Sequence, residues 1–326
     1  MRSDPHGSPF SDEGNHLVTT DNARVAVLLP CYNESLTIGK VVQDFRRELP
    51  QAEIWVYDNN STDGSAELAR AAGGNVRRVT RQGKGHVVRR MFQEVDADCY
   101  LMADSDDTYP AEAARELIAP VLTGEADMVN GDRLSSTYAT ENKRRFHSFG
   151  NWLVCTLIRR LFHYDIADVM TGYRAFSWRF AKHCPVLSSG FEIETEMTIF
   201  ALDKRMAIKE IPIAYRDRPK GSFSKLNTFA DGFRIIRTIF TLLRNYRPLF
   251  FFGSIAAILF LAAAVLAAPI IVVFLRIGLV PRFPTFIFAC TLAICGALSI
   301  VCGLILESTK RYGDQLFEIL LAQRRQ

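Results

Sequence analysis

The sequence lacks several features that would place it in a common class. It has no C-x-x-C pair among its seven cysteines, and its formal net charge of +4 is too mild to indicate nucleic-acid binding. Residues 1–22 contain no apolar stretch of the kind found in a secretory signal. We therefore expect free thiols in a reducing compartment, a disordered tail over residues 1–22 and a main soluble part that stays in the cytoplasm.

Signatures of several nucleotide-dependent and hydrolytic enzymes are also missing. The stretch LPCYNES follows the first predicted strand, where a dinucleotide-binding enzyme would carry G-x-G-x-x-G. The sequence has no G-x-x-x-x-G-K-[ST] P-loop and no G-x-S-x-G elbow. These absences argue against nicotinamide or flavin enzymes and P-loop ATPases, and they weaken a hydrolase interpretation.

Two long uncharged segments lie in the last quarter of the chain. They cover residues 249–275 and 283–306, and each exceeds the roughly 20 residues that cross a bilayer. Basic residues flank the pair, and the link between the segments is short. We predict a transmembrane hairpin over residues 248–306 with both ends at the cytoplasmic face. The alternative is a pair of buried core helices in a soluble protein.

The segments on either side of this hairpin are predicted to be helical. In residues 227–247, apolar side chains such as Phe229, Phe233 and Ile236 recur at three- and four-residue spacing, with arginines at other angles. This pattern predicts an amphipathic helix in the headgroup layer, although the same face would also pack on a soluble domain. Residues 307–326 are predicted to form a cytoplasmic C-terminal helix.

Residues 23–226 alternate between short apolar runs and segments with helical spacing. This pattern predicts an α/β domain with a mostly parallel sheet and helices on both faces. Right-handed crossovers bring the carboxyl ends of parallel strands to one edge, where such folds bind ligands. The polar motifs of the sequence follow predicted strands, so we expect them to gather at that edge.

Carboxylates end two of the predicted strands. Asp58 ends the second, and Asp104, Ser105 and Asp106 form a D-x-D motif after the fourth. Carboxylate oxygens suit Mg²⁺ or Mn²⁺, which complete their shells with substrate phosphates. A D-x-D motif can also be a turn or a helix cap, and Asp107 precedes a predicted helix. The position after a strand favours a metal site.

Basic residues lie in glycine-containing or small-residue loops. They are Lys84, Arg133, Arg174 and Lys225. Small residues let the backbone approach a phosphate closely, and arginine binds phosphate oxygens in bidentate fashion. These residues are candidate phosphate ligands, although lone basic residues are often solvated surface groups.

A series of motifs between Val25 and Leu226 now resembles a known family. In order, they are VAVLLPCYNE, VYDNNSTDGS, QGKGHVVRR, MADSDDTYP, VNGDR, MTGYRAFS, SSGFEIETEM and RPKGSFSKL. The chain resembles the family 2 glycosyltransferases of the GT-A fold, and more narrowly the polyprenyl-phosphate hexose synthases, which include dolichol-phosphate mannose synthase and bacterial polyprenyl-phosphate glucosyltransferases. The resemblance implies a GT-A domain over residues 23–226.

The resemblance also implies roles for individual residues. The nucleotide-sugar would be held by Pro30, Tyr32, Glu34, Asp58, Lys84, Asp104 and Ser105. Asp104 and Asp106 would hold the metal, and the catalytic set would be Asp104, Asp106, Arg133, Arg174 and Lys225. The chain departs from dolichol-phosphate mannose synthases at Thr108, where those enzymes have a metal-binding Gln. Glu192 and Glu194 lie where the family approaches its acceptor, but a structural role is an equal alternative.

The predicted reaction is an inverting, metal-dependent transfer of a hexose from a nucleotide-sugar to a polyprenyl phosphate. By resemblance we favour a UDP-sugar over a GDP-sugar and a homo-oligomer, with a tetramer as one option. In-line attack on the donor would give a β-linked product, and the basic residues that flank the hairpin place it at the cytoplasmic membrane face. Alternatives are a polysaccharide synthase of the same fold and a non-catalytic membrane scaffold. Against the former, the sequence lacks a Q-x-x-R-W motif.

Overall fold

The computed structural model describes residues 23–133, 155–156, 158–160, 162–190, 192–216, 240–241, 243–280 and 282–323. The chain divides into two compact units. The sheet unit comprises residues 1–142, 170–201 and 205–222, and the hairpin unit comprises residues 143–169, 202–204 and 223–326. The predicted tail, Lys225 and most of the predicted amphipathic helix lie outside the described residues.

The sheet unit is built on a seven-stranded mixed sheet with the order β3-β2-β1-β4-β6-β5-β7. The strands are β1 Val25–Cys31, β2 Glu53–Asp58, β3 Asn75–Arg78, β4 Cys99–Met102, β5 Met128–Asp132, β6 Arg174–Ser177 and β7 Ile208–Pro212. The β3-β2-β1-β4 half is parallel, whereas β6 runs antiparallel to both β4 and β5. The mostly parallel α/β sheet predicted from the sequence is confirmed.

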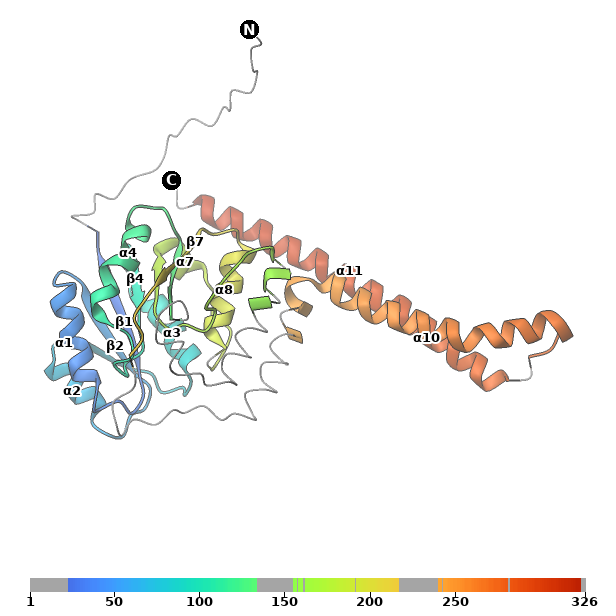
Figure 1. The fold of residues 1–326 in the computed structure, drawn as a ribbon, viewed down its shortest axis with the longest axis horizontal. Helices are drawn as coiled ribbons and strands as arrows, with labels where there is room; N and C mark the ends of the chain where they lie inside the picture. Colours follow the sequence, from blue (N-terminus) through green and yellow to red (C-terminus); the bar gives the residue numbers. More distant parts are fainter. Residues whose placement is uncertain are drawn as a thin grey trace, which may run out of the picture. The chain divides into compact units, whose positions relative to one another are not determined.

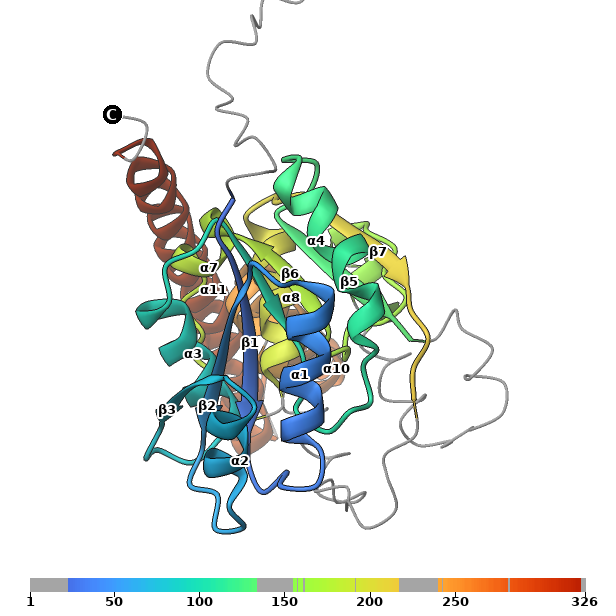
Figure 2. The ribbon, with the colours of Figure 1, turned by 90° about the vertical axis from the view of Figure 1, so that its left-hand side faces the viewer.

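Helices cover both faces of this sheet. They are α1 Ile38–Glu48, α2 Ser65–Ala71, α3 Lys84–Glu94, α4 Ala114–Leu122 with the preceding 3₁₀ turn η1 Ala111–Ala113, α7 Trp178–His183 and α8 Ile193–Asp203. In Figure 2, α1 and α4 lie on one side of the sheet and α3 on the other. Because β1, β2, β3 and β4 run parallel, their carboxyl ends lie at the same edge of the sheet. The loops described below begin at that edge.

Alternate residues of the central strands supply a core on each face. On β1, Val27, Leu29 and Cys31 pack with α1 and α4 in one hydrophobic cluster, because successive side chains of a strand point to opposite faces. The other face is rich in aromatic contacts, among them Phe92 against Phe176 with ring centroids 5.4 Å apart. Both faces of the central strands are buried, which explains their continuous apolar sequences.

The hairpin unit contains two long helices, α10 Pro248–Ile277 and α11 Phe283–Gln323, which lie side by side in Figure 1. Small residues bring the two helices together. Ala256 and Ala263, seven residues apart, are buried on α10, and a Cβ added at Gly296 on α11 would lie 3.2 Å from the ring of Phe260. Spacing of this kind is typical of closely packed membrane helices.

The outer surface of the hairpin is apolar. Both helices are long and apolar enough to cross a membrane, with mean hydropathies of 3.0 and 2.4 over their best windows. Their side chains are largely exposed, including Leu261 at 67 % and Leu275 at 78 %. A core helix of a soluble protein would bury these groups, so lipid is the environment that suits this surface.

The second long helix differs from expectation at its C-terminal end. α11 continues without a break from the apolar segment through the residues predicted to form a separate cytoplasmic helix. No proline lies in residues 307–323, and a Cβ added at Gly313 would meet no atom within 4 Å. The predicted membrane helix and the predicted C-terminal helix are therefore one helix.

Candidate functional site

The carboxyl ends of β1, β2 and β4 carry the first group of predicted site residues. Asp58 is paired in register with Cys31, so both strands end together. Ser105 Oγ donates a 2.9 Å hydrogen bond to the carbonyl oxygen of Pro30, which ties the turn after β4 to the end of β1. The parallel topology thus gathers Pro30, Asp58 and the D-x-D motif at one edge of the sheet.

The turn after β1 is fixed by hydrogen bonds to the turn after β2. The backbone N–H of Asn33 donates to Ser61 Oγ at 2.9 Å, and that of Glu34 donates to Ser65 Oγ at 2.8 Å. The backbone N–H of Ser61 in turn donates to Asp58 Oδ1 at 3.2 Å. The predicted nucleotide ligands Tyr32 and Glu34 therefore stand on a braced turn.

Asp63 completes this brace, although it was not among the predicted site residues. Its carboxylate accepts hydrogen bonds from the backbone N–H of Ser35 at 3.0 Å and from the backbone N–H of Ser65 at 3.1 Å. Burial opposes ionisation, but these bonds and that of the Ser65 hydroxyl lower the pKa of Asp63 to about 2. The carboxylate is charged at neutral pH and joins the two turns.

In the D-x-D motif, Thr108 holds Asp106. Asp106 is 3 % exposed, and its Oδ1 accepts a 2.6 Å hydrogen bond from the Thr108 hydroxyl. The backbone N–H of Thr108 donates to the same oxygen at 3.3 Å. The residue that departs from the dolichol-phosphate mannose synthase pattern thus orients the second carboxylate of the motif.

Lys84 links the D-x-D motif to α8. Its ammonium lies 2.6 Å from Asp104 Oδ1 and 2.7 Å from Glu194 Oε1. Burial alone would lower the pKa of Lys84, but the two carboxylates raise it well above its ordinary value. Within the part of the chain that the structure describes, Glu194 Oε2 is buried without a hydrogen-bond partner. This oxygen can accept a bond from a ligand hydroxyl.

Glycines make room for this arrangement at two places. A Cβ added at Gly85, beside Lys84, would lie 2.0 Å from the carbonyl oxygen of Ser188, so only glycine lets the start of α3 approach that loop. A Cβ added at Gly172 would lie 2.7 Å from Asp104 Oδ2. The absence of a side chain at Gly172 therefore leaves room for the Asp104 carboxylate in its present position.

Arg133 reaches the same neighbourhood through aromatic residues. Its guanidinium lies over the Tyr215 ring, 5.4 Å from the ring centroid. The Tyr215 segment runs beside the D-x-D loop, because the backbone N–H of Arg216 donates to the carbonyl oxygen of Thr108 at 2.9 Å. Burial raises the pKa of Tyr215, whereas Arg133 and the Thr108 hydroxyl lower it. Arg133 is thus brought toward the carboxylates.

Arg174 lies in a different environment from the other predicted site residues. Its side chain is fully buried, its Nε donates to the carbonyl oxygen of Thr171 at 2.9 Å, and its Nη1 donates to Thr198 Oγ1 at 2.9 Å. These contacts hold the loop before β6 against α8, so they are those of a positioning residue. Direct contact between Arg174 and phosphate stays a prediction.

The carboxylates fit a metal that shares its shell with a substrate. Among the described residues, no group of three or more His, Cys, Asp or Glu side chains could hold a metal by itself. Asp104 and Asp106 nevertheless lie on one short loop, and Asp106 is held by Thr108. Mg²⁺ and Mn²⁺ are commonly bound by one or two carboxylates together with substrate phosphates, so the donor set suits either ion.

Comparison with known proteins identifies the fold and the family. Residues 26–183 match the model of glycosyl transferase family 2. The chain is 34 % identical over 232 residues to glycosyltransferase AglJ of Haloferax volcanii, covering 71 % of this chain and 76 % of that protein. It is 32 % identical over 216 residues to the dolichyl-phosphate hexose transferase of the same organism, covering 66 % of this chain and 92 % of the relative.

A solved structure shows the same fold. Glucosyl-3-phosphoglycerate synthase of Mycobacterium tuberculosis, in complex with Mn²⁺, UDP and glucosyl-3-phosphoglycerate, matches with a TM-score of 0.55 and 23 % identity. The match covers 73 % of this chain and 85 % of that one. The strand-end carboxylates, the mixed sheet and the sequence relatives agree, and the chain belongs to the family 2 glycosyltransferases.

Proposed function

We propose that this glycosyltransferase transfers a hexose from a nucleoside diphosphate sugar, with a UDP-sugar favoured, to a polyprenyl phosphate. The observation that carries the proposal is the combination of one site and one surface. The site joins Asp104, Asp106 and Lys84 at the edge of a nucleotide-binding fold. The surface is a helical hairpin with an exposed apolar exterior, which suits an enzyme whose acceptor is a membrane lipid.

The donor would bind across the ends of β1, β2 and β4. The braced turn with Tyr32 and Glu34 faces the base and ribose in this arrangement, and the buried Asp58 supports the turn through the Ser61 N–H. Because the backbone of this turn is braced before the donor arrives, little ordering of the turn is needed on binding. The presence of UDP in the structural neighbour favours uracil as the base.

A divalent ion would be held by Asp104 and Asp106 with the donor diphosphate. Such an ion supplies Lewis-acid stabilisation of the leaving diphosphate, which is worth several kcal/mol in other enzymes. Thr108 keeps Asp106 in place, and Gly172 places no side chain against Asp104 Oδ2. The ammonium of Lys84 remains protonated between its two carboxylates and adds positive charge near the same group.

The acceptor chemistry needs no strong general base. A polyprenyl phosphate oxygen is already anionic at neutral pH, so the protein needs only to attract and orient it. Among the residues that the structure describes, Arg133, which is held over Tyr215, is our candidate for attracting the acceptor phosphate. Lys225 is a second candidate and lies outside the described residues. In-line attack on the anomeric carbon would invert its configuration and give a β-linked lipid product.

The hairpin would hold the enzyme where its acceptor lies. Extraction of a prenyl chain into water costs about 0.8 kcal/mol per CH₂, so a membrane-bound enzyme avoids a large penalty. Basic residues near the predicted membrane ends, among them Arg247 and Arg311, favour a cytoplasmic position for both ends of the hairpin. A cysteine at Gly278 should then be labelled from the outer side, and one at Gly313 from the cytoplasmic side.

The proposal is tested by a donor panel. The purified full-length protein would be incubated with UDP- and GDP-sugars and a short polyprenyl phosphate, and the lipid product identified by mass. We expect a glycosyl phosphate lipid that is lost with EDTA and with Asp106→Asn, while the variant keeps its folded circular-dichroism spectrum. Full turnover in EDTA would exclude a role for the metal. The absence of a lipid product with every donor would exclude a polyprenyl phosphate as the acceptor.

A further inference from the structure

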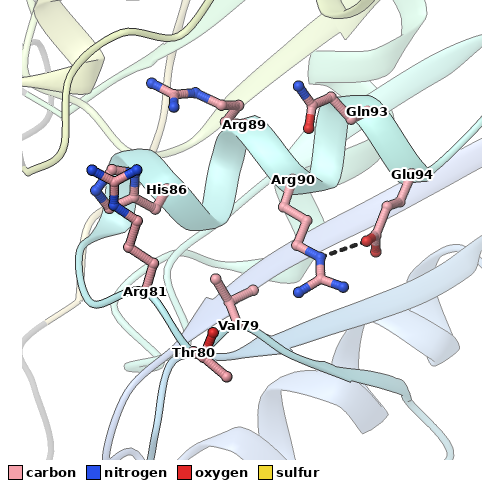
Figure 3. Close-up of a pocket in the computed structure, with 8 residues that line it drawn as sticks. All are labelled: Val79, Thr80, Arg81, His86, Arg89, Arg90, Gln93 and Glu94. Carbon is pink, nitrogen blue, oxygen red and sulfur yellow. Dashed lines mark hydrogen bonds and ion pairs between the residues drawn. The ribbon is translucent and has the colours of Figure 1, made fainter.

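A cavity of about 260 Å³ lies between the loop after β3 and the outer face of α3. Figure 3 shows the residues that line it, which are Val79, Thr80, Arg81, His86, Arg89, Arg90, Gln93 and Glu94. None of the predicted donor or metal ligands is among them. A liquid water molecule occupies about 30 Å³, so the cavity has room for a small anion.

The lining carries an excess of positive charge. Arg90 is neutralised by Glu94, with Nε and Oε1 2.5 Å apart, and Figure 3 shows Arg90 turned toward that carboxylate. Arg81, His86 and Arg89 differ, because no carboxylate among the residues that the structure describes forms an ion pair with them. Three basic side chains thus line one cavity, in which the one carboxylate of the lining, Glu94, is paired with Arg90.

These basic groups act on one another. Burial lowers the pKa of His86, and the charges of Arg81 and Arg89 lower it further. Both arginines are therefore close enough to repel a proton on the imidazole. In Figure 3, Arg81 reaches from its loop toward His86 on α3. An anion placed among the three would relieve this repulsion.

Hydrogen-bond donors remain available in the cavity. Arg89 Nε donates to the carbonyl oxygen of Val186 at 2.6 Å, which fixes the side chain, and its terminal nitrogens form no hydrogen bond with another described residue. The side chain of Arg81 likewise has no described partner. Guanidinium groups in this state present paired N–H donors that match the oxygens of a phosphate.

We propose that this cavity binds a phosphate group, at a site whose lining includes none of the predicted donor or metal ligands. Two sources carry that chemistry: a soluble phosphate compound and the phosphomonoester headgroup of a membrane lipid. Either one would be held by the forks of Arg81 and Arg89, with His86 beside them. Because α3 begins at Lys84 and carries His86 and Arg89, occupancy would stabilise the helix that presents Lys84.

Histidine-ring NMR on the full-length protein in phosphatidylcholine nanodiscs tests this. The His86 signal, assigned with His86→Gln, would be followed as inorganic phosphate is added, with chloride at equal ionic strength as the reference. We expect phosphate to raise the pKa of His86, because an anion favours the charged imidazole. Arg81→Gln should weaken phosphate binding by about tenfold or more, and Arg81→Lys should weaken it less.

Arg70→Gln is the matched control, since Arg70 is an exposed arginine on α2 outside the cavity, and it should bind phosphate like the wild type. Nanodiscs containing phosphatidic acid distinguish the sources. A His86 shift without added phosphate assigns the site to a lipid headgroup, and a shift only with free phosphate assigns it to a soluble compound. The proposal is overturned if neither shifts His86 beyond the chloride reference, or if Arg81→Gln responds like the wild type.

Discussion

Lys84 at the start of α3 and Glu194 at the start of α8 form a buried ion pair, with Nζ and Oε1 2.7 Å apart. The same ammonium contacts Asp104 at 2.6 Å. This pair explains why an acidic residue stands at an otherwise apolar position of α8. It also sets the geometry of Asp104, because the lysine holds one oxygen of that carboxylate.

Glu194→Gln should reduce transfer and alter its pH dependence. The amide keeps the shape of the side chain but removes one of the two charges that raise the pKa of Lys84. The Lys84 pKa should therefore fall toward its ordinary value, and activity should be lost at a lower alkaline pH than in the wild type. Rate–pH profiles of both proteins measure this, and coincident alkaline limbs would contradict it.

Lys84→Met should be more damaging than Glu194→Gln. It leaves Asp104 and Glu194 near each other without a shared cation, and loss of one partner from a buried ion pair costs about 3–5 kcal/mol. We expect a lower thermal midpoint together with loss of turnover. Lys40→Met is a useful comparison, since Lys40 pairs with Asp107 at 2.7 Å but is 52 % exposed, and it should change stability little.

Thr108→Val should weaken metal-dependent activity while preserving the fold. Valine has nearly the shape of threonine but cannot donate to Asp106 Oδ1. Groups that orient metal ligands typically change affinity by about 10–100-fold, so half-maximal activity should need correspondingly more Mn²⁺. Thr108→Ser keeps the hydroxyl and should restore most of the response. Identical Mn²⁺ titrations for Thr108→Val and the wild type would show that Asp106 needs no such support.

Gly172→Ala should impair donor use through a steric effect on Asp104. The new methyl group would start 2.7 Å from Asp104 Oδ2, so that carboxylate must move. Gly39→Ala is the matched control, because open space surrounds Gly39 on α1 and alanine suits a helix better by about 1 kcal/mol. Steady-state kinetics should show a large fall in kcat/KM for Gly172→Ala alone, and equal values for the two variants would argue against this role.

Asp63 should contribute to the stability of the fold in a way that is lost at acidic pH. Its pKa is lowered from 3.8 to about 2 in the folded protein, so its contribution is complete above the unfolded value and disappears as pH falls toward about 2. Asp63→Asn should therefore lower the thermal midpoint at neutral pH. The difference in thermal midpoint between this variant and the wild type should shrink as the pH falls from 3.8 to about 2. Thermal midpoints measured at several pH values would reveal a constant difference if Asp63 had no such role.

Much of the fold and the gathering of carboxylates at the sheet edge could be predicted because their signals are local. Apolar runs followed by Asp58 and Asp104 mark strand ends, and parallel topology brings such ends together. β6 was not predicted, since its four residues lie in a motif with no alternation, and its antiparallel pairing depends on distant strands. The burial of Arg174 was also missed, because Thr198 and Thr171 decide it through tertiary contacts.

The Lys84–Glu194 pair also depends on a tertiary contact and could not be predicted from the sequence. Each residue was singled out in the sequence, but the two are distant along the chain and no local pattern joins them. A signal was nevertheless present, because Glu194 precedes a run of buried residues on α8 and a buried acid requires a partner. Asp63 could likewise have been recognised as a turn-forming acid beside Ser65.

The unbroken course of α11 has a practical consequence. With 41 residues at about 1.5 Å each, it measures about 60 Å, roughly twice the hydrocarbon thickness of a bilayer. Once its apolar part is embedded, the remainder continues as a rigid helix beyond the lipid surface. A fluorophore attached near Ile319 would then lie at a fixed distance from the bilayer surface, and energy transfer to dyes in the bilayer would measure that distance.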